Sequence, residues 1–214
     1  MTPRRSGRQK KFKHTPPKKN NKLPLAVGLL IIIIVVITMV YMFAMNNPSD
    51  STTPGGTVLL HTSKGDITIQ LRDDRPITTT NFKNLVQQGI YDGTIFHRVI
   101  YGFVVQGGDP TGTGYGDPSI PNIQDELDGD NHNNRGTVAM AKKSDPTTGK
   151  SIPNSGSSQF FINLADNNDL AAEYSVFGTV ISGMNIVDEI ANVATDENGR
   201  PVLDVTLIDA EIIS

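Results

Sequence analysis

The pattern of apolar and polar positions divides the chain into two parts of different character. Residues 25–45 form a run of about 21 residues without a charged side chain, including the unbroken apolar stretch 29–37. A helix of this length rises roughly 30 Å, which matches the hydrocarbon thickness of a bilayer. Tyr41 lies near the outer end of the run, where an aromatic ring suits the membrane interface. We therefore predict one transmembrane helix over residues 23–45.

Two other interpretations of this apolar run are open. A buried core helix would need polar relief over such a length, and none is present. A cleaved signal peptide has an apolar region of about 7–15 residues, followed by small residues at the cleavage site. Here the run is longer, and Phe43, Ala44 and Met45 make a poor cleavage site. We therefore favour an uncleaved signal anchor.

Beyond residue 57 the pattern changes to short apolar runs separated by turn residues. Apolar residues at helical spacing predict helices over residues 79–88, ended by Gly89, and over residues 184–193. Many short strands with two isolated helices favour a mainly β fold, a closed antiparallel barrel rather than a parallel sheet. The predicted strands are residues 58–62, 67–71, 94–100, 103–106, 137–140, 159–163, 176–180 and 205–213, with a hairpin turn at 63–66.

Charge is distributed unevenly along the chain. Nine of the 19 Lys and Arg residues lie in the first 22 positions without an acid, which leaves ten against all 22 Asp and Glu residues. The acidic remainder argues against nucleic acid as a partner. A cationic flank stays in the cytoplasm, so we expect residues beyond 45 to lie outside the cell membrane. The chain contains no cysteine, which excludes disulfides, thiolate metal sites and a lipoprotein anchor.

These patterns predict four segments. Residues 1–22 form a basic cytoplasmic tail, and residues 23–45 form the signal anchor. Residues 46–56, rich in Pro, Gly, Ser and Thr, form a flexible linker. Residues 57–214 show no internal repeat and form a single domain.

Three blocks of this domain carry candidate chemistry. Residues 96–110 place Arg98 among Phe and Val, where a charged head group needs either a function or a carboxylate partner. Residues 154–163 place Gln159 and Phe161 on one side of a strand, and residues 169–178 supply Leu170 and Tyr174. Taken singly, each block is also compatible with ordinary core and loop.

Together the blocks resemble the cyclophilin family of peptidyl-prolyl cis-trans isomerases. The resemblance lies in FHRVIYGFVVQGGDPTGTG, GTVAMA, GSSQFFINL and YSVFGTVISGMNIVDEI, in the family's order, and it covers essentially all of residues 57–214. It implies an eight-stranded antiparallel barrel closed at its ends by two helices. The tyrosine at position 174 resembles the residue found there in bacterial members. Asp169 stands where many eukaryotic members have Trp, which implies weak cyclosporin binding.

The resemblance also implies a set of site residues. Arg98 takes the place of the catalytic arginine, and Tyr174 takes a position that is often His. By the same resemblance, Phe103, Val104, Phe161 and Leu170 form the proline pocket, Gln106 and Gln159 orient the peptide, and Ala141 and Lys142 contact it through their backbone. We therefore assign catalytic roles to Arg98, Phe103 and Gln106, and substrate-binding roles to Val104, Gln159, Phe161, Leu170, Tyr174, Ala141 and Lys142.

The expected activity is prolyl isomerisation that accelerates folding of exported or membrane-associated proteins. It needs no cofactor and no metal. The expected partners are proline-containing polypeptides and, through residues 23–45, the bilayer, and we expect a monomer. The alternative is a non-catalytic chaperone or scaffold module that binds proline peptides.

Two other candidate sites are weaker. Residues 125–132 offer oxygen ligands without the spacing of a calcium loop, which favours a solvated acidic loop. His97 and Asp109 lack a nucleophile elbow, which favours a packed structural histidine over a hydrolase triad.

Overall fold

The computed structural model describes residues 55–214. The predicted basic tail, the predicted anchor and most of the linker lie outside this range. Neither helix between residues 55 and 214 combines the length and apolarity needed to cross a membrane. The described residues belong to one compact unit, Thr52–Ser214, in which the fold can be followed strand by strand.

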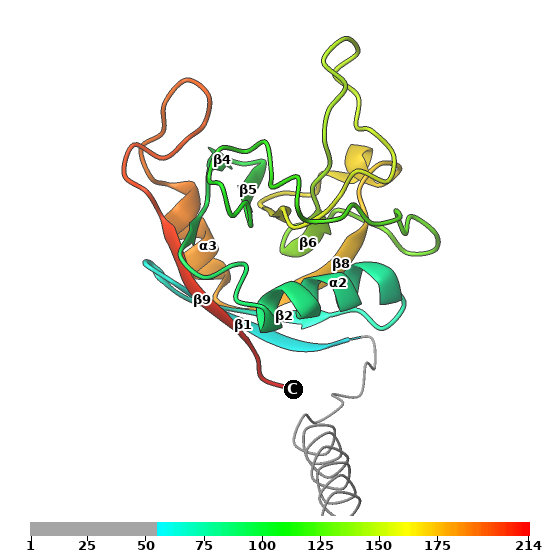
Figure 1. The fold of residues 1–214 in the computed structure, drawn as a ribbon. Coiled ribbons are helices and arrows are strands. Elements are labelled where there is room, and N and C mark those ends of the chain that lie inside the picture. The colour runs from blue at the N-terminus through cyan, green and yellow to red at the C-terminus, as the bar shows by residue number, and fades with distance from the viewer. Residues whose placement is uncertain (1–54) are drawn as a thin grey trace, which may run out of the picture. The chain divides into compact units, whose positions relative to one another are not determined.

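One curled sheet of nine strands forms most of this unit (Figure 1). Every neighbouring pair of strands in it is antiparallel. The order across the sheet is β3-β9-β1-β2-β8-β6-β7-β5-β4. The strands are β1 (Gly56–Thr62), β2 (Gly65–Leu71), β3 (Thr94–Ile95), β4 (Arg98–Ile100), β5 (Val104–Gly107), β6 (Thr137–Met140), β7 (Phe160–Asn163), β8 (Val176–Ser182) and β9 (Thr206–Ile212).

The count of nine strands differs from the expected eight because one predicted strand is divided. The prediction treated residues 94–100 as continuous, whereas Phe96 and His97 leave the ladder. The part before this break pairs with β9 and the part after it pairs with β5. Strands β3 and β4 are therefore the two ends of the sheet order but close neighbours in the chain. An isolated bridge between Ile95 and Asp109 brings β3 beside the end of β5, so the sheet curls back on itself.

Two α-helices accompany the sheet, as predicted. Helix α2 (Pro76–Gln87) begins three residues before the predicted start. Pro76 fits its first turn, and the Glu126 carboxylate accepts hydrogen bonds from the free N–H groups of Ile77 (3.0 Å) and Thr78 (2.8 Å). This carboxylate comes from far along the chain, so local sequence signals could not reveal the cap. Helix α3 (Met184–Ala191) buries Val187, Ile190 and Ala191, and a short 3-10 helix, η1 (Asn168–Leu170), was not predicted.

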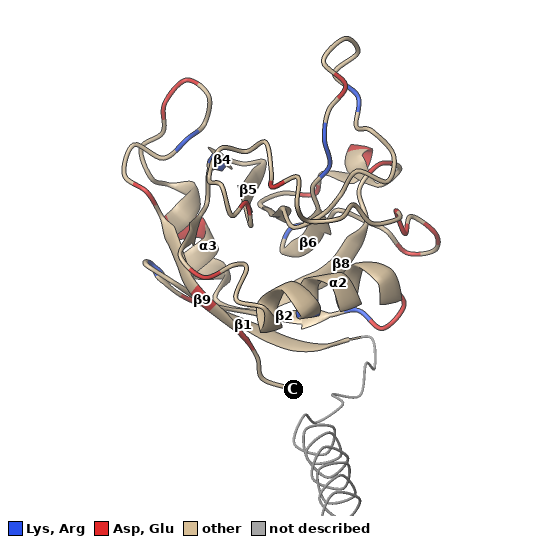
Figure 2. Cartoon of the chain, viewed as in Figure 1, with Lys and Arg blue, Asp and Glu red and all other residues tan. Residues whose placement is uncertain are grey.

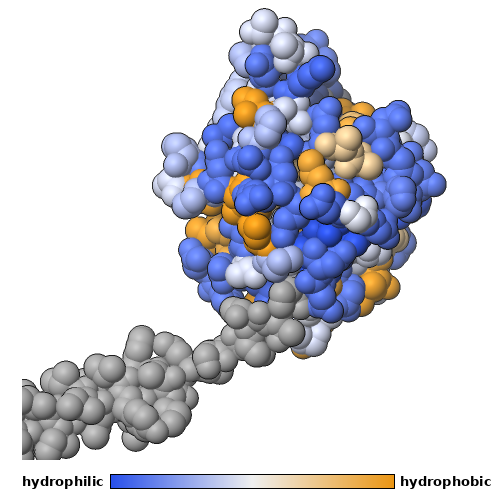
Figure 3. Space-filling view, turned by 90° about the vertical axis from the view of Figure 1, so that its right-hand side faces the viewer, coloured by the Kyte–Doolittle hydropathy of each residue, from blue (hydrophilic) through white to orange (hydrophobic). Residues whose placement is uncertain are grey.

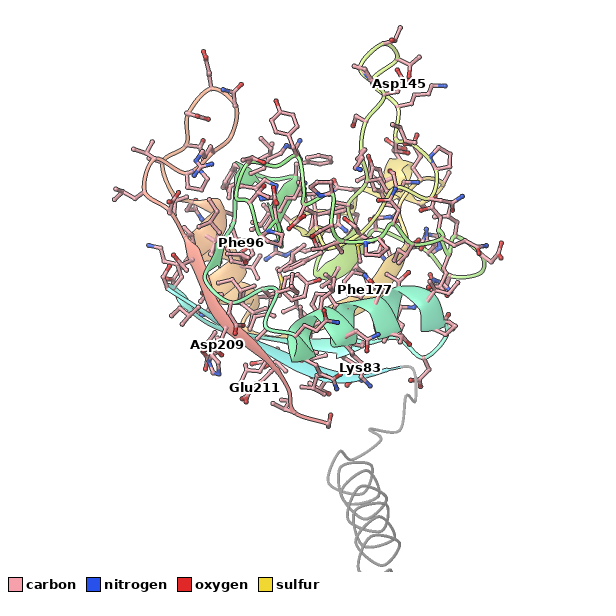
Figure 4. The ribbon with its side chains drawn as sticks, in the orientation of Figure 1. Lys83, Phe96, Asp145, Phe177, Asp209 and Glu211 are labelled. Carbon is pink, nitrogen blue, oxygen red and sulfur yellow. The ribbon has the colours of Figure 1, made fainter. Side chains whose placement is uncertain are left out.

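The sheet separates two apolar clusters. Because side chains alternate along a strand, Phe160 and Ile162 of β7 enter the main core, whereas Phe161 enters a second cluster on the other face. The main core also contains Phe96 and Phe177, which lie inside the curled sheet (Figure 4). The second cluster consists of Val104, Ala139, Ala141, Phe161 and Val176, from β5, β6, β7, β8 and the residue that follows β6.

The two ends of the described chain lie together. The N–H of Thr57 donates to the Ser214 carbonyl at 2.8 Å, and the N–H of Ile213 donates to the Thr57 carbonyl at 2.8 Å. Strand β1, which begins at this end, pairs with β2 on one side and β9 on the other (Figure 1).

Candidate active site

The second apolar cluster forms the floor of a cavity of about 660 Å³. The cavity brings together segments that lie far apart in the sequence, from β4 to the loop after η1. Gln159 lines a smaller neighbouring cavity of about 60 Å³ instead. The other nine predicted site residues line the large cavity: Arg98, Phe103, Val104, Gln106, Ala141, Lys142, Phe161, Leu170 and Tyr174.

The pairing of three strands places the polar residues in a row. Arg98 on β4 lies opposite Gln106 on β5, and Gln106 lies opposite Phe161 on β7. The Arg98 Nη1 donates to Gln106 Oε1 at 3.3 Å, and the Gln106 Nε2 donates to Gln159 Oε1 at 2.9 Å. The Gln159 Nε2 then donates to the Gly114 carbonyl at 3.0 Å. This chain of hydrogen bonds connects the guanidinium to the backbone of the loop that contains Gly114 and so fixes its orientation.

Arg98 makes no ion pair with any carboxylate of residues 55–214. Its guanidinium carbon lies 5.9 Å from the centroid of the Phe103 ring, and the residue is half-buried. The interpretation in which Arg98 is a structural partner of an acid is therefore not supported. A partly desolvated cation without an acid can direct its donors at a ligand.

Phe161 and Tyr174 form the apolar side of the cavity. Their rings meet edge to face, with centroids 5.4 Å apart and an interplanar angle of 81°. Phe161 is only 5% exposed, and burial raises the pKa of the Tyr174 hydroxyl, which stays neutral. Phe103, Leu170 and Tyr174 pack against the cluster from its rim. The result is an apolar surface beside one guanidinium, a combination that suits a ring next to an amide.

A buried asparagine network supports the rim. Asn163 on β7 is fully buried and donates to Asn133 Oδ1 at 3.1 Å. Asn167 donates from its side-chain nitrogen to the Phe103 carbonyl and to Asn163 Oδ1, both at 2.9 Å. The backbone that carries Phe103 is therefore fixed by hydrogen bonds that strand propensity does not predict.

Lys142 has an additional role that the sequence did not reveal. The expectation was a backbone contact with substrate, but its side chain is also only 3% exposed and pairs with Asp125 at 2.8 Å. The ammonium lies 5.6 Å from the centroid of the Tyr174 ring. Asp125 also accepts the N–H of Asn154 at 3.0 Å. This ion pair ties the acidic loop to the cavity wall.

The acidic loop 125–132 is therefore not simply solvated. Asp125 pairs with Lys142, Glu126 caps α2, and the carbonyls of Asp128 and Asp130 accept hydrogen bonds from the buried Arg75 guanidinium. Within residues 55–214, no group of three His, Cys, Asp or Glu side chains is arranged to hold a metal ion. The acids and carbonyls of loop 125–132 instead hold neighbouring segments in place.

Asp109 is a structural carboxylate. Burial would raise its pKa, but hydrogen bonds from Thr111 and from the N–H groups of Gly116 (3.2 Å) and Gly114 (2.6 Å) outweigh this effect and lower it. It thereby organises loop 109–116, whose Gly114 carbonyl holds Gln159.

His97 is packed inside the structure, in line with its expected structural role. It is 8% exposed, and neither ring nitrogen has a hydrogen-bond partner within the described residues. Burial lowers its pKa, although the nearby Asp109 carboxylate opposes the shift. A histidine without a partner at either nitrogen does not form a hydrolase triad.

Several cavity residues were missed by sequence reasoning. They come from two loops, which have no apolar periodicity to mark them. One sequence feature could have indicated part of this lining: two consecutive lysines, at residues 142–143, follow an apolar strand. The missed lining residues are Gly114, Tyr115, Lys143, Ser144 and Ile152.

Comparisons with other proteins agree with this geometry. The family model described as cyclophilin type peptidyl-prolyl cis-trans isomerase matches residues 57–212. Peptidyl-prolyl cis-trans isomerase ppi1 of Schizosaccharomyces pombe is 42% identical over 157 residues, which are 72% of this chain and 96% of that protein. An Arabidopsis thaliana peptidyl-prolyl cis-trans isomerase is 42% identical over 155 residues, 71% of this chain and 92% of its own length.

Solved structures give the same result. A cyclophilin type peptidyl-prolyl cis-trans isomerase of Cryptosporidium parvum superimposes with a TM-score of 0.68 at 33% identity, covering 75% of this chain and 98% of its own. A second structure of that protein, in the presence of the dipeptide Ala-Pro, gives a TM-score of 0.67 at 34% identity, covering 74% of this chain and 99% of its own. The expected mainly β fold with two helices is confirmed. The chain belongs to the cyclophilin-type peptidyl-prolyl cis-trans isomerases and is an enzyme of that class.

Proposed function

We propose that the large cavity is the catalytic site and that Arg98 stabilises the twisted X-Pro amide. The observation that carries this proposal is the environment of Arg98. Its guanidinium is held by Gln106, has no carboxylate partner among residues 55–214, and stands at the edge of an apolar surface. A cation in this position has donors available for a substrate.

The chemistry follows from the nature of the bond. Amide resonance sets a barrier of about 18–20 kcal/mol, so an X-Pro bond isomerises only over tens to hundreds of seconds. Twisting the bond removes the resonance and returns a lone pair to the prolyl nitrogen. A donor from Arg98 to that nitrogen interacts with the twisted state more strongly than with either planar isomer, which lowers the barrier.

The remaining residues hold the substrate during rotation. Val104, Phe161 and Leu170, together with Phe103, provide the surface for the proline ring. Gln106 and Gln159 keep the guanidinium oriented through the hydrogen bonds described above. The related Cryptosporidium protein, studied in the presence of Ala-Pro, supports a proline-containing peptide as the occupant here.

The cellular setting is also a proposal. The apolar run at residues 23–45 and the cationic residues before it support a cell-membrane protein whose catalytic domain faces outward and assists exported or membrane-associated proteins. The face shown in Figure 3 is mostly hydrophilic with small, separate apolar patches, which supports a monomer. Tyr174 supports a bacterial-type member, and Asp169 supports weak cyclosporin binding.

The test is prolyl isomerisation of a short X-Pro peptide by the full-length chain and by Arg98→Ala. We expect the substitution to lower kcat/KM at least about tenfold, which corresponds to about 1.4 kcal/mol of transition-state stabilisation. Arg135→Ala removes an exposed arginine whose partners Leu164 and Asp188 lie outside the cavity, and it should retain the wild-type rate. Peptide binding without acceleration would instead identify a non-catalytic binding module.

A further inference from the structure

The charged residues that line the cavity are all cations, although the surrounding protein is acidic. They are Arg98, Lys142 and Lys143, and no Asp or Glu lines the cavity. Beyond residue 22 the chain has only ten Lys and Arg against 22 Asp and Glu, because nine of its 19 cations precede that point. The positive lining is therefore a local feature of this site.

The two adjacent lysines differ in their partners. The Lys142 ammonium is neutralised by Asp125 at 2.8 Å and is almost completely buried. Lys143 is exposed and makes no ion pair with any described residue. Its charge is therefore available to a ligand, whereas the charge of Lys142 is already satisfied.

The backbone of Lys143 is held in place although its side chain is exposed. Its N–H donates to Ser155 Oγ at 3.0 Å, and its carbonyl accepts the N–H of Ile152 at 2.8 Å. Ser155 is buried and also donates to the Ile152 carbonyl at 2.7 Å. These bonds close the base of the loop 143–152, so the Lys143 side chain extends from a backbone of defined position beside the cavities.

Lys143 also connects two cavities. The smaller cavity of about 60 Å³ contains no acidic lining residue either. One residue of an extended peptide advances about 3.5 Å, so a segment with its proline on the apolar floor can continue past this shared boundary. The residues that line both cavities are Gln106, Gly114, Tyr115, Ala141, Lys142 and Lys143.

Two acids, one in the loop 143–152 and one hydrogen-bonded to it, already have other partners. Asp145 accepts the N–H groups of Thr147 (2.7 Å) and Thr148 (3.0 Å), and it lies on the upper part of the loop in Figure 4. Glu173 accepts the Ser151 hydroxyl at 2.6 Å. Neither acid lines the large cavity or the smaller one. Figure 2 shows Lys or Arg positions on both arms of this loop.

We infer that Lys143 makes this isomerase prefer X-Pro segments that carry an Asp or Glu side chain within about three residues of the proline. This inference rests on the proposed function, because the proline must occupy the large cavity for the flanking residue to reach Lys143. A cation paired with a partly exposed carboxylate contributes up to about 1 kcal/mol, which corresponds to a preference of about two- to fivefold.

The experiment measures kcat/KM for full-length protein on a peptide series with one X-Pro bond. Glu or Gln is placed at each of the three positions before the proline and the two positions after it. The ratio of Glu to Gln peptide is determined within each variant, so any general change in rate cancels. The variants are Lys143→Gln, Lys143→Glu and, as the matched control, Lys150→Gln, which changes a lysine of the same loop that lines neither cavity.

We expect wild type and Lys150→Gln to favour Glu by about two- to fivefold at one or more positions. The ratio should fall to about one in Lys143→Gln and below one in Lys143→Glu. It should also fall when salt rises from about 0.1 M to about 1 M, because the screening length shortens from about 10 Å to about 3 Å.

Two outcomes overturn the inference while leaving the isomerase activity intact. One is acceleration of every Gln peptide with no Glu preference at any position. The other is a Glu preference that persists in Lys143→Gln. Such a result would assign the preference to Arg98 or to the electrostatic potential of the other charged residues. If no peptide is accelerated, the proposed function fails instead, and the dissociation constants of the same Glu and Gln peptides then decide whether Lys143 selects acids.

Discussion

Two stretches of the same sheet differ in what covers their outer faces. Strands β5, β6, β7 and β8 carry apolar residues on both faces, one set in the main core and the other in the second cluster under the cavity. Strands β1, β2 and β9 carry charged residues outside, where His61 contacts Asp66, Asp209 and Glu211. Asp209 and Glu211 point away from the sheet in Figure 4.

The difference indicates where a ligand can be bound on this fold. An outer face with charges is stable in water by itself, so nothing needs to cover it. An outer face with Phe161 and Val104 is stable only where loops shelter it, and the loops that do so leave an opening. The apolar residues on both faces of β5, β6, β7 and β8 and the cavity above them therefore occur together for the same reason.

The largest expected effect is a loss of stability when the apolar outer face is disrupted. Phe161→Ala removes a buried ring that packs against Tyr174 at 5.4 Å, and it should lower the free energy of unfolding by about 3 kcal/mol. Ile208→Ala changes an exposed residue of β9, 51% accessible, and should cost less than about 1 kcal/mol. Urea unfolding of both variants measures the contrast. Equal losses would show that the second cluster contributes no more than ordinary surface.

An intermediate effect separates activity from stability. Gln106→Leu removes the acceptor of Arg98 and the donor to Gln159, so the guanidinium loses its orientation. We expect kcat/KM to fall about tenfold. Glu211→Gln, on the charged outer face, is the control and should leave the rate unchanged. If Gln106→Leu keeps full activity with an unaltered fold, the hydrogen-bond chain does not position Arg98.

The smallest effect is a pH dependence on the charged face. The hydrogen bond that the His61 ring donates to the Asp66 carboxylate raises the pKa of His61, and the charges of Asp209 and Glu211 act in the same direction. The pair therefore stabilises the protein fully below about pH 6.5, the unfolded value, and loses this contribution as pH rises through the higher folded pKa.

The variant His61→Asn tests whether this contribution to stability decreases as pH rises. Because the pair is exposed, the difference in unfolding free energy between wild type and variant should stay below about 1 kcal/mol. It should be larger at about pH 6 than at about pH 9. A difference that is the same at both pH values would exclude the ion pair as its source.

Much of the fold follows from strand alternation in the sequence, whereas the site residues were predicted from the resemblance of several sequence blocks to one family. The spacing of Phe161 and Gln159 predicted that they share one side of a strand, and their site roles came from the family resemblance; Phe161 lines the large cavity and Gln159 the smaller one. The break at Phe96 and His97 was not predicted, because residues 94–100 contain no Gly or Pro to mark it and the division arises from pairing with two different strands.

The remaining errors concern long-range contacts. Glu126 caps α2, and Asp125 neutralises Lys142, across separations at which local propensity carries no information. Lys143 and Ile152 belong to loops without periodicity, so their place in the cavity depends on how those loops close. The family resemblance identified the residues on the floor of the site, and neither it nor the sequence pattern identified most of the loop residues that line its wall.

The hydrogen-bonded ends of the domain have a mechanical consequence. Because Thr57 and Ser214 are joined, tension applied at Gly56 acts along β1, which is held on both sides by β2 and β9. Such a load shears two ladders at once instead of unzipping one edge bond by bond. A domain whose two ends lie this close can also be inserted between two residues of another protein without forcing those residues apart.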